Sequence, residues 1–422
     1  MSVPMRIFMC LSFRRRFREA PGVRSARSLA PFFCLAFLCL ALAAPSPARA
    51  QAEGPAIASP SAILVDYESG TVLFERNADA PMAPASLNNL MTMGVVFHEI
   101  AEGRLTPDQE FKVSEYAWRR GGAPSGNTAM FAALNSNVKV SDLMRGVIVQ
   151  SGNDAAIVLA EGIAGNELAF ANKMNDEAKR LGLTGSTFRN PGGLPDPDQK
   201  VTARDMASLT AHLIRDYPQF YPIFAEAEFT WNKIRQSNRN PLLGMSLGAD
   251  GLKTGFLKDA GYHLVGSAVS NAQRLIVVVM GAKSDKERAE DARKLLEWGF
   301  RSFEQRLLFD TGQIVGEATL YGGARGGAPL TGKGPIHLLV PRSGNERISA
   351  KIQYEGPIRA PVVKGAELAH LRVFRGEQVA LDVPLVAAED VPQGPLWRRA
   401  MDGAYELVVG LARQGYAKLK GS

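Results

Sequence analysis

The chain has 422 residues, 46% hydrophobic and 22% charged, which suits a globular protein of two or three domains and excludes a disordered or collagen-like one. Its formal charge of +7 comes from the first fifty residues, which hold eight arginines and one glutamate. Because the rest of the chain is formally neutral, the charge gives no support for a nucleic-acid partner.

Residues 1–50 are predicted to be a signal peptide. Basic residues precede an apolar run at 30–44 that is short for a membrane span, and small residues follow at Ala48 and Ala50. Gln51 is then the first residue of the exported protein, and an uncleaved anchor is the alternative. All three cysteines lie in this segment (Cys10, Cys34 and Cys39), so the exported part has neither a disulfide nor a catalytic cysteine.

The residues that follow predict one α+β domain over 51–304. A hairpin at 61–75 opens it, and a helical block, three strands and a closing helix follow. We expect helices at 86–103, 140–149, 151–162 and 172–181, one beginning after Thr202, and one at 289–300, with strands at 251–255, 262–269 and 275–280.

A second, smaller module is predicted at 305–390. Apolar residues alternate there with period two, at 348–354 and again at 379–385, and glycine pairs at 322–323 and 326–327 mark turns, so we expect an all-β domain. A final helix is predicted at 395–420, with an apolar face beginning at Trp397 and an excess of basic residues elsewhere. That pattern is typical of a helix lying in a membrane surface. The alternative is a helix packed on its own β domain.

Three short motifs suggest chemistry. Ser86 begins a helix, Ser151-Gly152-Asn153 lies on a turn between two helices, and Lys253-Thr254-Gly255 lies on a strand. Each alone has an ordinary structural reading, as a helix cap, a turn and a surface strand. A serine at a helix N-terminus also lies near free N–H groups that stabilise developing negative charge.

Together these motifs resemble the penicillin-recognising serine enzymes. The chain is most similar to the low-molecular-mass penicillin-binding proteins that act as D-alanyl-D-alanine carboxypeptidases, serine peptidases with a β-lactamase/transpeptidase-like fold. The residues that carry the resemblance are 84–87, 90–92, 151–155, 190–194, 202–207 and 251–255.

The resemblance implies a role for each motif. Ser86 would be the nucleophile that forms an acyl-enzyme with the penultimate D-alanine, and the backbone N–H groups of Ser86 and Phe256 would form the oxyanion hole. Ser151 would relay protons and Asn153 would hold the substrate amide. Lys253 would bind the terminal carboxylate, and its strand, including Thr254 and Gly255, would dock the peptide by backbone hydrogen bonds.

One position departs from the family pattern Ser-x-x-Lys, because Asn89 stands where the lysine is expected. Three residues along a helix place Asn89 on the same face as Ser86. A neutral amide cannot take the serine proton, and losing a general base costs roughly 10²–10⁴ in rate. Lys253 acting through Ser151 is the only substitute base that the sequence offers.

Three functions follow as alternatives. The first is a periplasmic serine carboxypeptidase that trims peptidoglycan stem peptides, is inhibited by β-lactams and is held on the inner-membrane surface by its last helix. The second is a non-catalytic relative that binds stem peptides. A β-lactamase is the third, although no residue is evident for activating a deacylating water.

No cofactor, metal or nucleic acid is expected. His98 and Glu99 lack a second histidine at the spacing of a zinc peptidase. The five histidines are scattered along the chain, at His98, His212, His263, His337 and His370.

Overall fold

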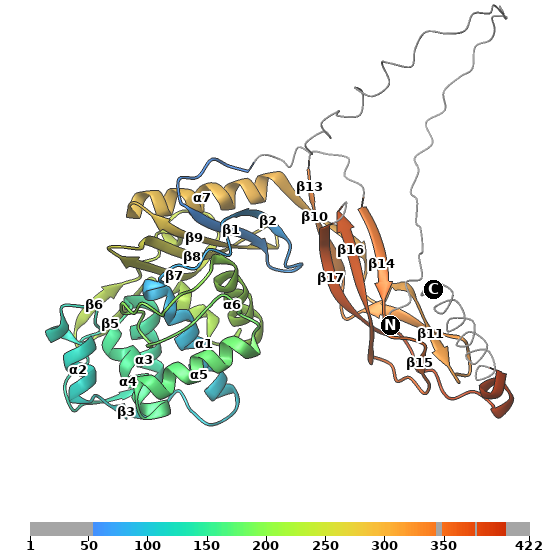
Figure 1. The fold of residues 1–422 in the computed structure, drawn as a ribbon, viewed down its shortest axis with the longest axis horizontal. Coiled ribbons are helices and arrows are strands. Elements are labelled where there is room, and N and C mark those ends of the chain that lie inside the picture. Colours follow the sequence, from blue (N-terminus) through green and yellow to red (C-terminus); the bar gives the residue numbers. More distant parts are fainter. Residues whose placement is uncertain (1–53, 343–347, 376–377, 402–422) are drawn as a thin grey trace, which may run out of the picture.

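The computed structural model describes residues 54–342, 348–375 and 378–401. Figure 1 shows two parts, a larger one that combines helices with a sheet and an elongated one built from strands. The helices are α1 (Asn89–Ala101), α2 (Glu115–Gly121), α3 (Val140–Arg145), α4 (Asn153–Ala164), α5 (Glu167–Arg180), α6 (Ala203–Asp216) and α7 (Asp285–Ser302).

The central sheet of the larger part is antiparallel and has the order β2-β1-β9-β8-β7. Its strands are β1 (Ser61–Asp66), β2 (Val72–Arg76), β7 (Ala249–Leu257), β8 (Gly261–Ser270) and β9 (Gln273–Ala282). The N-terminal hairpin pairs with β9, so the two ends of the domain meet in one sheet, as the sequence predicts. β7 lies at the sheet's edge.

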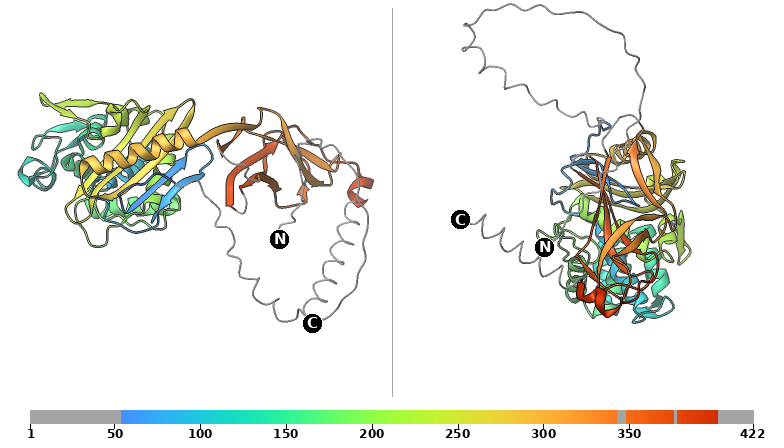
Figure 2. Two further views of the ribbon diagram at one scale, coloured as in Figure 1. Left: turned by 90° about the horizontal axis from the view of Figure 1, so that it is seen from above. Right: turned by 90° about the vertical axis from the view of Figure 1, so that its right-hand side faces the viewer.

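The larger part has three layers (Figure 2), with α7 across one face of the sheet and the helical block against the other. Alternate residues of each strand supply two separate apolar cores. On β9, Ile276 and Val278 pack with the helical block, whereas Val277 and Val279 pack with α7. This double burial explains why 275–280 is continuously apolar.

The elements predicted between residues 61 and 300 are present, and capping residues set several of their boundaries. Thr202 accepts a hydrogen bond from the Asp205 N–H at 3.1 Å, which begins α6 as expected. The helix predicted at 172–181 begins earlier, at Glu167, because the Asn166 side chain caps it. The helix predicted at 289–300 likewise begins at Asp285, after the cap Ser284.

The segment predicted as one helix at 140–149 is α3 followed by a π-helical turn, Gly146–Gln150. The sequence analysis also missed α2 and two short hairpins, β3 (Glu110–Lys112) with β4 (Asn137–Lys139) and β5 (Glu228–Trp231) with β6 (Ile234–Ser237). These pieces are too short for a periodicity to stand out.

The elongated part is all-β, as predicted. Its strands are β10 (Phe303–Phe309), β11 (Ile314–Tyr321), β12 (Gly327–Gly332), β13 (Ile336–Pro341), β14 (Ile348–Gln353), β15 (Ile358–Arg359), β16 (Glu367–Arg375) and β17 (Gln378–Ala387). The alternation on β17 marks its buried face, where Leu381 and Leu385 are enclosed. On β14, by contrast, Ile348 and Ala350 are exposed, because this strand lies at the edge of its sheet.

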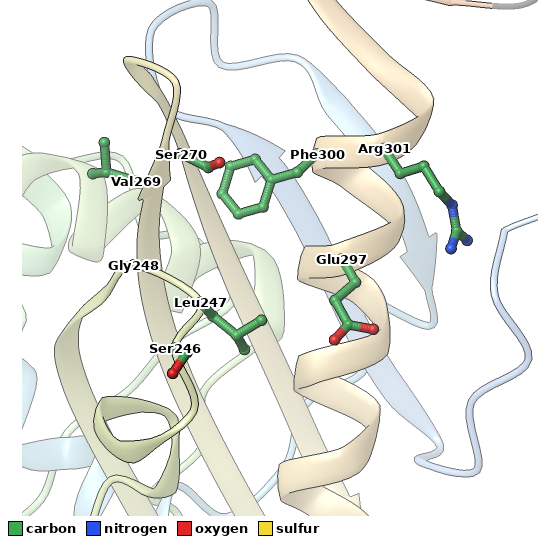
Figure 3. Close-up of a pocket in the computed structure, with 8 residues that line it drawn as sticks. All are labelled: Ser246, Leu247, Gly248, Val269, Ser270, Glu297, Phe300 and Arg301. Atoms are coloured by element: carbon green, nitrogen blue, oxygen red, sulfur yellow. The ribbon is translucent and has the colours of Figure 1, made fainter.

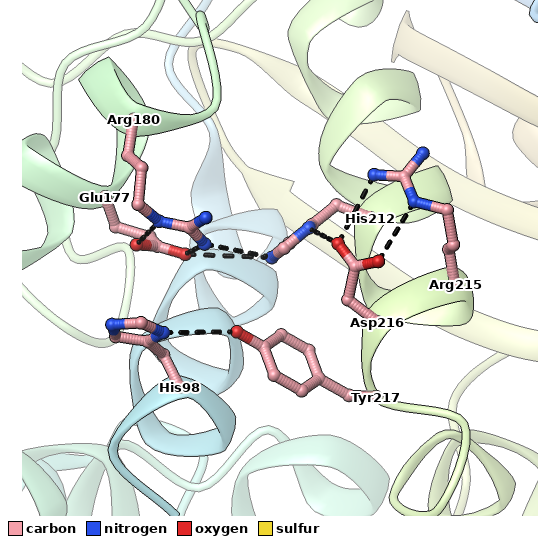
Figure 4. A network of polar contacts seen from close by, with 7 residues as sticks. All are labelled: His98, Glu177, Arg180, His212, Arg215, Asp216 and Tyr217. Carbon is pink, nitrogen blue, oxygen red and sulfur yellow. Dashed lines mark hydrogen bonds and ion pairs between the residues drawn. The ribbon is translucent and has the colours of Figure 1, made fainter. Parts of the chain in front are cut away.

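A polar network connects α5 to α6 (Figure 4). Its residues do not belong to the three motifs singled out in the sequence. Glu177 accepts two hydrogen bonds from the Arg180 guanidinium, and His212 lies between Glu177 and Asp216. Burial alone would raise the pKa of Glu177, but the hydrogen bonds from Arg180 and His212 outweigh it and lower the pKa to about 2. The network has a structural role in joining the two helices.

The signal peptide predicted at 1–50 and most of the helix predicted at 395–420 lie outside the described residues. A helical segment begins at Leu396 and is described as far as Met401. Across 54–342, 348–375 and 378–401, no helix has the length and apolar character needed to cross a membrane. The domain limits near 304 and 390 stay predictions.

Candidate functional site

Ser86 lies in a 3-10 turn, Ala85–Asn88, that leads directly into α1. The residue before it, Ala85, has φ of +50°, a conformation that non-glycine residues seldom adopt. Ser86 itself is only half-buried, although its neighbours Ala85 and Leu87 are fully enclosed. The fold therefore holds the serine on a tight turn at the start of a buried helix and leaves it partly open to solvent.

Two close backbone approaches fix this turn. A methyl group on Gly255 of β7 would lie 3.1 Å from the Ser86 nitrogen, so the Lys-Thr-Gly strand runs directly beside the serine. On another side, a methyl group on Gly193 would lie 1.9 Å from the Ala85 carbonyl oxygen, and Gly193 has φ of +83°. Only glycine satisfies both conditions at position 193.

Ser151 and Asn153 flank the start of α4. Ser151 ends the π-helical turn with φ of +69°, and Asn153 is the first residue of α4. The Asn153 backbone N–H and side-chain Nδ2 both donate to the Thr128 carbonyl, at 2.8 and 3.0 Å. The Asn153 amide is thereby oriented by a loop that the sequence analysis did not single out.

The side chain of Asn153 also lies against the loop that supports Ser86. A methyl group on Gly192 would meet Asn153 Oδ1 at 2.3 Å. The same loop accepts a hydrogen bond from Asn88 Nδ2 to the Asn190 carbonyl, at 2.5 Å. The loop 190–193 therefore links the serine turn to the asparagine of the second motif.

Lys253 lies in β7 and is only 2% exposed. Its Nζ donates to the Thr254 carbonyl at 3.3 Å, and no carboxylate forms an ion pair with it among the residues that the structure describes. Burial, together with the nearby charges of Arg239 and Arg288, lowers the pKa of Lys253 to about 7. An unpaired buried ammonium is well suited to meet an incoming carboxylate.

Asn89 is buried and makes two hydrogen bonds. Its Nδ2 donates to the Pro191 carbonyl at 3.2 Å, and its Oδ1 accepts from Ser151 Oγ at 3.2 Å. Thr92 donates to the same Pro191 carbonyl at 2.7 Å. The amide therefore fills the position beside Ser151 and connects the first motif to the second.

The remaining residues of the third motif lie along β7. Thr254 is buried and Gly255 contacts the serine turn, whereas Phe256 is 52% exposed. The Phe256 ring packs on Tyr262 of β8, with the ring centroids 4.3 Å apart. The structure thus brings all three motifs to one region, between the edge of the sheet and the start of α1.

Sequence reasoning missed two supporting residues. Arg288 of α7 donates to the carbonyl oxygens of Gly255 and His263, at 3.4 and 3.3 Å. These hydrogen bonds hold the strand of the third motif against α7. Asp154 is fully buried and accepts hydrogen bonds from the backbone N–H groups of Met130 and Ala132. A charged residue on a periodic helix gives no sign in sequence of such a long-range contact.

An open pocket lies away from the motifs (Figure 3). It has a volume of about 520 Å³ and is lined by residues of the β8–β9 end, the segment before β7, and α7, including Ser246, Val269 and Phe300. None of the motif residues lines it. Within the described part of the chain, no group of three or more histidine, cysteine or acidic side chains is placed to hold a metal ion.

Comparison with known proteins agrees with this arrangement. The sequence profile of the D-alanyl-D-alanine carboxypeptidase family matches residues 48–284, and that of the penicillin-binding protein 5 C-terminal domain matches residues 303–393. The chain is 38% identical over 362 residues to D-alanyl-D-alanine carboxypeptidase DacA of Haemophilus influenzae, covering 85% of this chain and 91% of that protein. It is 39% identical over 370 residues to DacC of Escherichia coli, covering 87% and 92%.

The solved structures give the same result. The crystal structure of penicillin-binding protein 5 from Haemophilus influenzae superposes with a TM-score of 0.71 at 38% identity, and the match covers 80% of this chain and 99% of that one. Both parts of the fold are included in that coverage. The chain belongs to the D-alanyl-D-alanine carboxypeptidase family of penicillin-binding proteins.

Proposed function

We propose that this protein recognises the D-alanyl-D-alanine end of peptidoglycan stem peptides and reacts with it, and with β-lactams, through an acyl-enzyme on Ser86. The observation that carries the proposal is the close packing of Gly255 on the Ser86 turn, which places a serine, a buried lysine and a free strand edge in one region. Family membership supports the same reaction class.

Each residue has a role in this proposal. Ser86 attacks the carbonyl carbon of the penultimate D-alanine, and the N–H groups of Ser86 and Phe256 stabilise the oxyanion. Asn153, oriented by Thr128, holds the substrate amide. Lys253 binds the terminal carboxylate, and the exposed edge of β7 pairs with the peptide backbone.

Turnover is expected to be slow because Asn89 cannot accept the serine proton. In an Asn89→Lys variant an amine would stand on the face of α1 that carries Ser86, and recovery of a general base is worth roughly 10²–10⁴ in rate. The gain should come from proton transfer, since Asn89 is already well packed and hydrogen-bonded.

Labelling with a fluorescent penicillin tests the proposal. We expect the wild-type protein to form a covalent band slowly, Ser86→Ala to form none, and Asn89→Lys to form it roughly 10²–10⁴ times faster. Asn89→Gln is the matched control, since it extends the side chain without adding a base, and its labelling rate should stay near that of wild type. A band that persists in Ser86→Ala would overturn the role of Ser86.

The second candidate is a non-catalytic relative that binds stem peptides in the same site. Asn89 favours it, because a neutral amide bonded to both Ser151 and Pro191 is a stable replacement for the lysine. A wild type that stays unlabelled while Asn89→Lys is labelled would establish this candidate in place of the first.

The proposal includes location. Action on peptidoglycan requires export, which the predicted signal peptide at 1–50 would provide, and would place the protein in the periplasm. The predicted helix at 395–420 would hold it on the inner-membrane surface. Exposed apolar side chains at its described start support this, with Leu396 79% and Trp397 64% exposed.

A further inference from the structure

The hydrogen bonds around Asn89 can run in only one direction. The Pro191 carbonyl has no proton to give, so the Asn89 group facing it must be the donor, Nδ2. Oδ1 therefore faces Ser151, and because an amide oxygen only accepts, the Ser151 hydroxyl must donate to it. The chemistry of Pro191 thus determines where the proton of Ser151 points.

This direction is the reverse of the one that a protonated lysine would impose. A charged lysine at position 89 would donate to Ser151 and leave the hydroxyl proton free for another partner. With Asn89 the proton is already engaged, and only the lone pairs of Ser151 Oγ remain. No other group donates to this oxygen among the residues that the structure describes.

Asn89 connects Ser151, which carries these free lone pairs, to the turn that carries Ser86. Asn89 follows Ser86 by three residues at the start of α1, so the two side chains emerge from one side about 5–6 Å apart at Cβ. Ser151 is hydrogen-bonded to Asn89 and 4% exposed. An acceptor beside the nucleophile favours a ligand that carries an N–H at that point.

Resting on the proposed function, we propose that Asn89 fixes Ser151 as a hydrogen-bond acceptor towards Ser86. The site then binds an intact D-alanyl-D-alanine peptide through the N–H of the bond to be cleaved. Ser86 is acylated readily only by substrates whose leaving group needs no proton. Asn89 is a positioning residue in this proposal, and the preferred donor class is a thioester.

The two reactions differ in the fate of one proton. In both, the Ser86 oxygen bonds to the carbonyl carbon and its proton passes to solvent. With a thioester the C–S bond breaks, and sulfur leaves with the electron pair as a stable thiolate. With a peptide the C–N bond breaks, and the nitrogen must receive a proton, which Ser151 cannot give without losing its bond to Asn89.

Acylation rates test the proposal with a matched pair of substrates, a peptide ending in D-alanyl-D-alanine and a thioester of the same acyl group with thioglycolate. We expect Asn89→Lys to accelerate the peptide reaction by at least ten times more than the thioester reaction. Equal acceleration of both substrates would overturn the role of Ser151 while leaving the proposed function intact. Loss of thioester activity in Ser86→Ala is required by the proposed function itself, and its absence would overturn both.

A binding measurement avoids any dependence on how well Asn89→Lys folds. We expect the wild type to bind the amide at least ten times more tightly than the ester analogue in which oxygen replaces the scissile N–H. The ester oxygen cannot donate a hydrogen bond to Ser151 Oγ, which in this proposal can only accept one. Ser151→Ala should remove this preference. An amide-to-ester ratio that is unchanged in Ser151→Ala would contradict the proposal.

Discussion

At the scale of single residues, the low pKa of Lys253 predicts that ligand binding depends on pH. Burial, with a smaller contribution from the charges of Arg239 and Arg288, lowers its pKa to about 7. The ammonium that would bind the terminal carboxylate is therefore lost as the pH rises through about 7. We expect the dissociation constant of a D-alanyl-D-alanine peptide to increase about tenfold between pH 8 and 9.

Calorimetric titration from pH 6 to 9 would measure this effect. The same peptide with an amidated C-terminus is the control ligand, and its weaker binding should not vary in this way. Lys253→Arg should flatten the pH profile, because a guanidinium stays protonated throughout. Wild-type affinity that is constant over this range would show that Lys253 does not meet the carboxylate.

The same shift has a consequence for folding. Between about pH 7 and the usual lysine value of 10.5, the unfolded chain binds the Lys253 proton and the folded protein does not. The contribution of Lys253 to the free energy of unfolding therefore rises with pH over that window. The side chain thus lowers stability at neutral pH and below, which is typical of a group retained for function.

The candidate site residues could be named from the sequence, but their surroundings could not. Ser86, Ser151 and Lys253 could be named from short motifs. The burial of Lys253 could not be predicted, because a lysine on a strand is usually a surface residue. Its charged neighbours Arg239 and Arg288 come from separate parts of the chain. The direction of the Ser151 hydrogen bond was equally inaccessible, since it depends on the Pro191 carbonyl.

At the scale of elements, Asp154 anchors the loop that orients the second motif. Its carboxylate accepts from the N–H groups of Met130 and Ala132 at 2.8 and 3.1 Å. In Asp154→Ala both donors are left buried without a partner, and each unsatisfied group costs about 1–3 kcal/mol, so we expect a loss of about 3 kcal/mol. Urea unfolding would measure it.

The control for Asp154 is Asp176→Ala on α5. That carboxylate is 74% exposed and forms an exposed ion pair with Lys179, so the loss should be below about 0.5 kcal/mol. Asp154→Ala should also slow penicillin labelling, because Thr128, which orients Asn153, belongs to the displaced loop. Equal stability of the two variants would show that the loop is held by other contacts.

Elements could be predicted from sequence wherever periodicity was long. The helices α1, α4 and α6 and the strands β7 to β9 stand close to their expected places. The start of α5 was missed, although its cap, Asn166, is a residue type that often begins helices. The exposure of β14 could not be predicted for a different reason, since alternation gives the period of a strand but not its place in a sheet.

At the scale of the whole molecule, the order of the elements was sufficient to predict the architecture. An N-terminal hairpin and three late strands form one sheet, and a separate set of strands forms the second part. The hydroxyl of Thr71, at the tip of the first hairpin, donates to the Ala380 carbonyl of β17. No sequence pattern indicates that contact, because it joins two parts of the fold that each have their own sheet.

Exposed apolar side chains stand where the described part of the C-terminal segment ends. Leu396, Trp397 and Met401 are all at least 63% exposed at the described start of the C-terminal helix. The Arg398 guanidinium donates to the Ala324 carbonyl at 2.6 Å, which fixes this start against the β domain. Deletion of residues 395–422 should move the protein from the membrane fraction to the soluble fraction of lysed cells.

A point substitution makes the test more specific. Trp397→Glu places a charge on the apolar face and should reduce the membrane-bound fraction severalfold, because burying such a ring at the interface contributes about 1.5–3 kcal/mol. Leu168→Glu is the matched control, since Leu168 is also exposed (69%) but lies on α5. Its fractionation should equal that of wild type. If Trp397→Glu and the deletion both leave the protein on membranes, the helix packs on its own β domain and the attachment has another source.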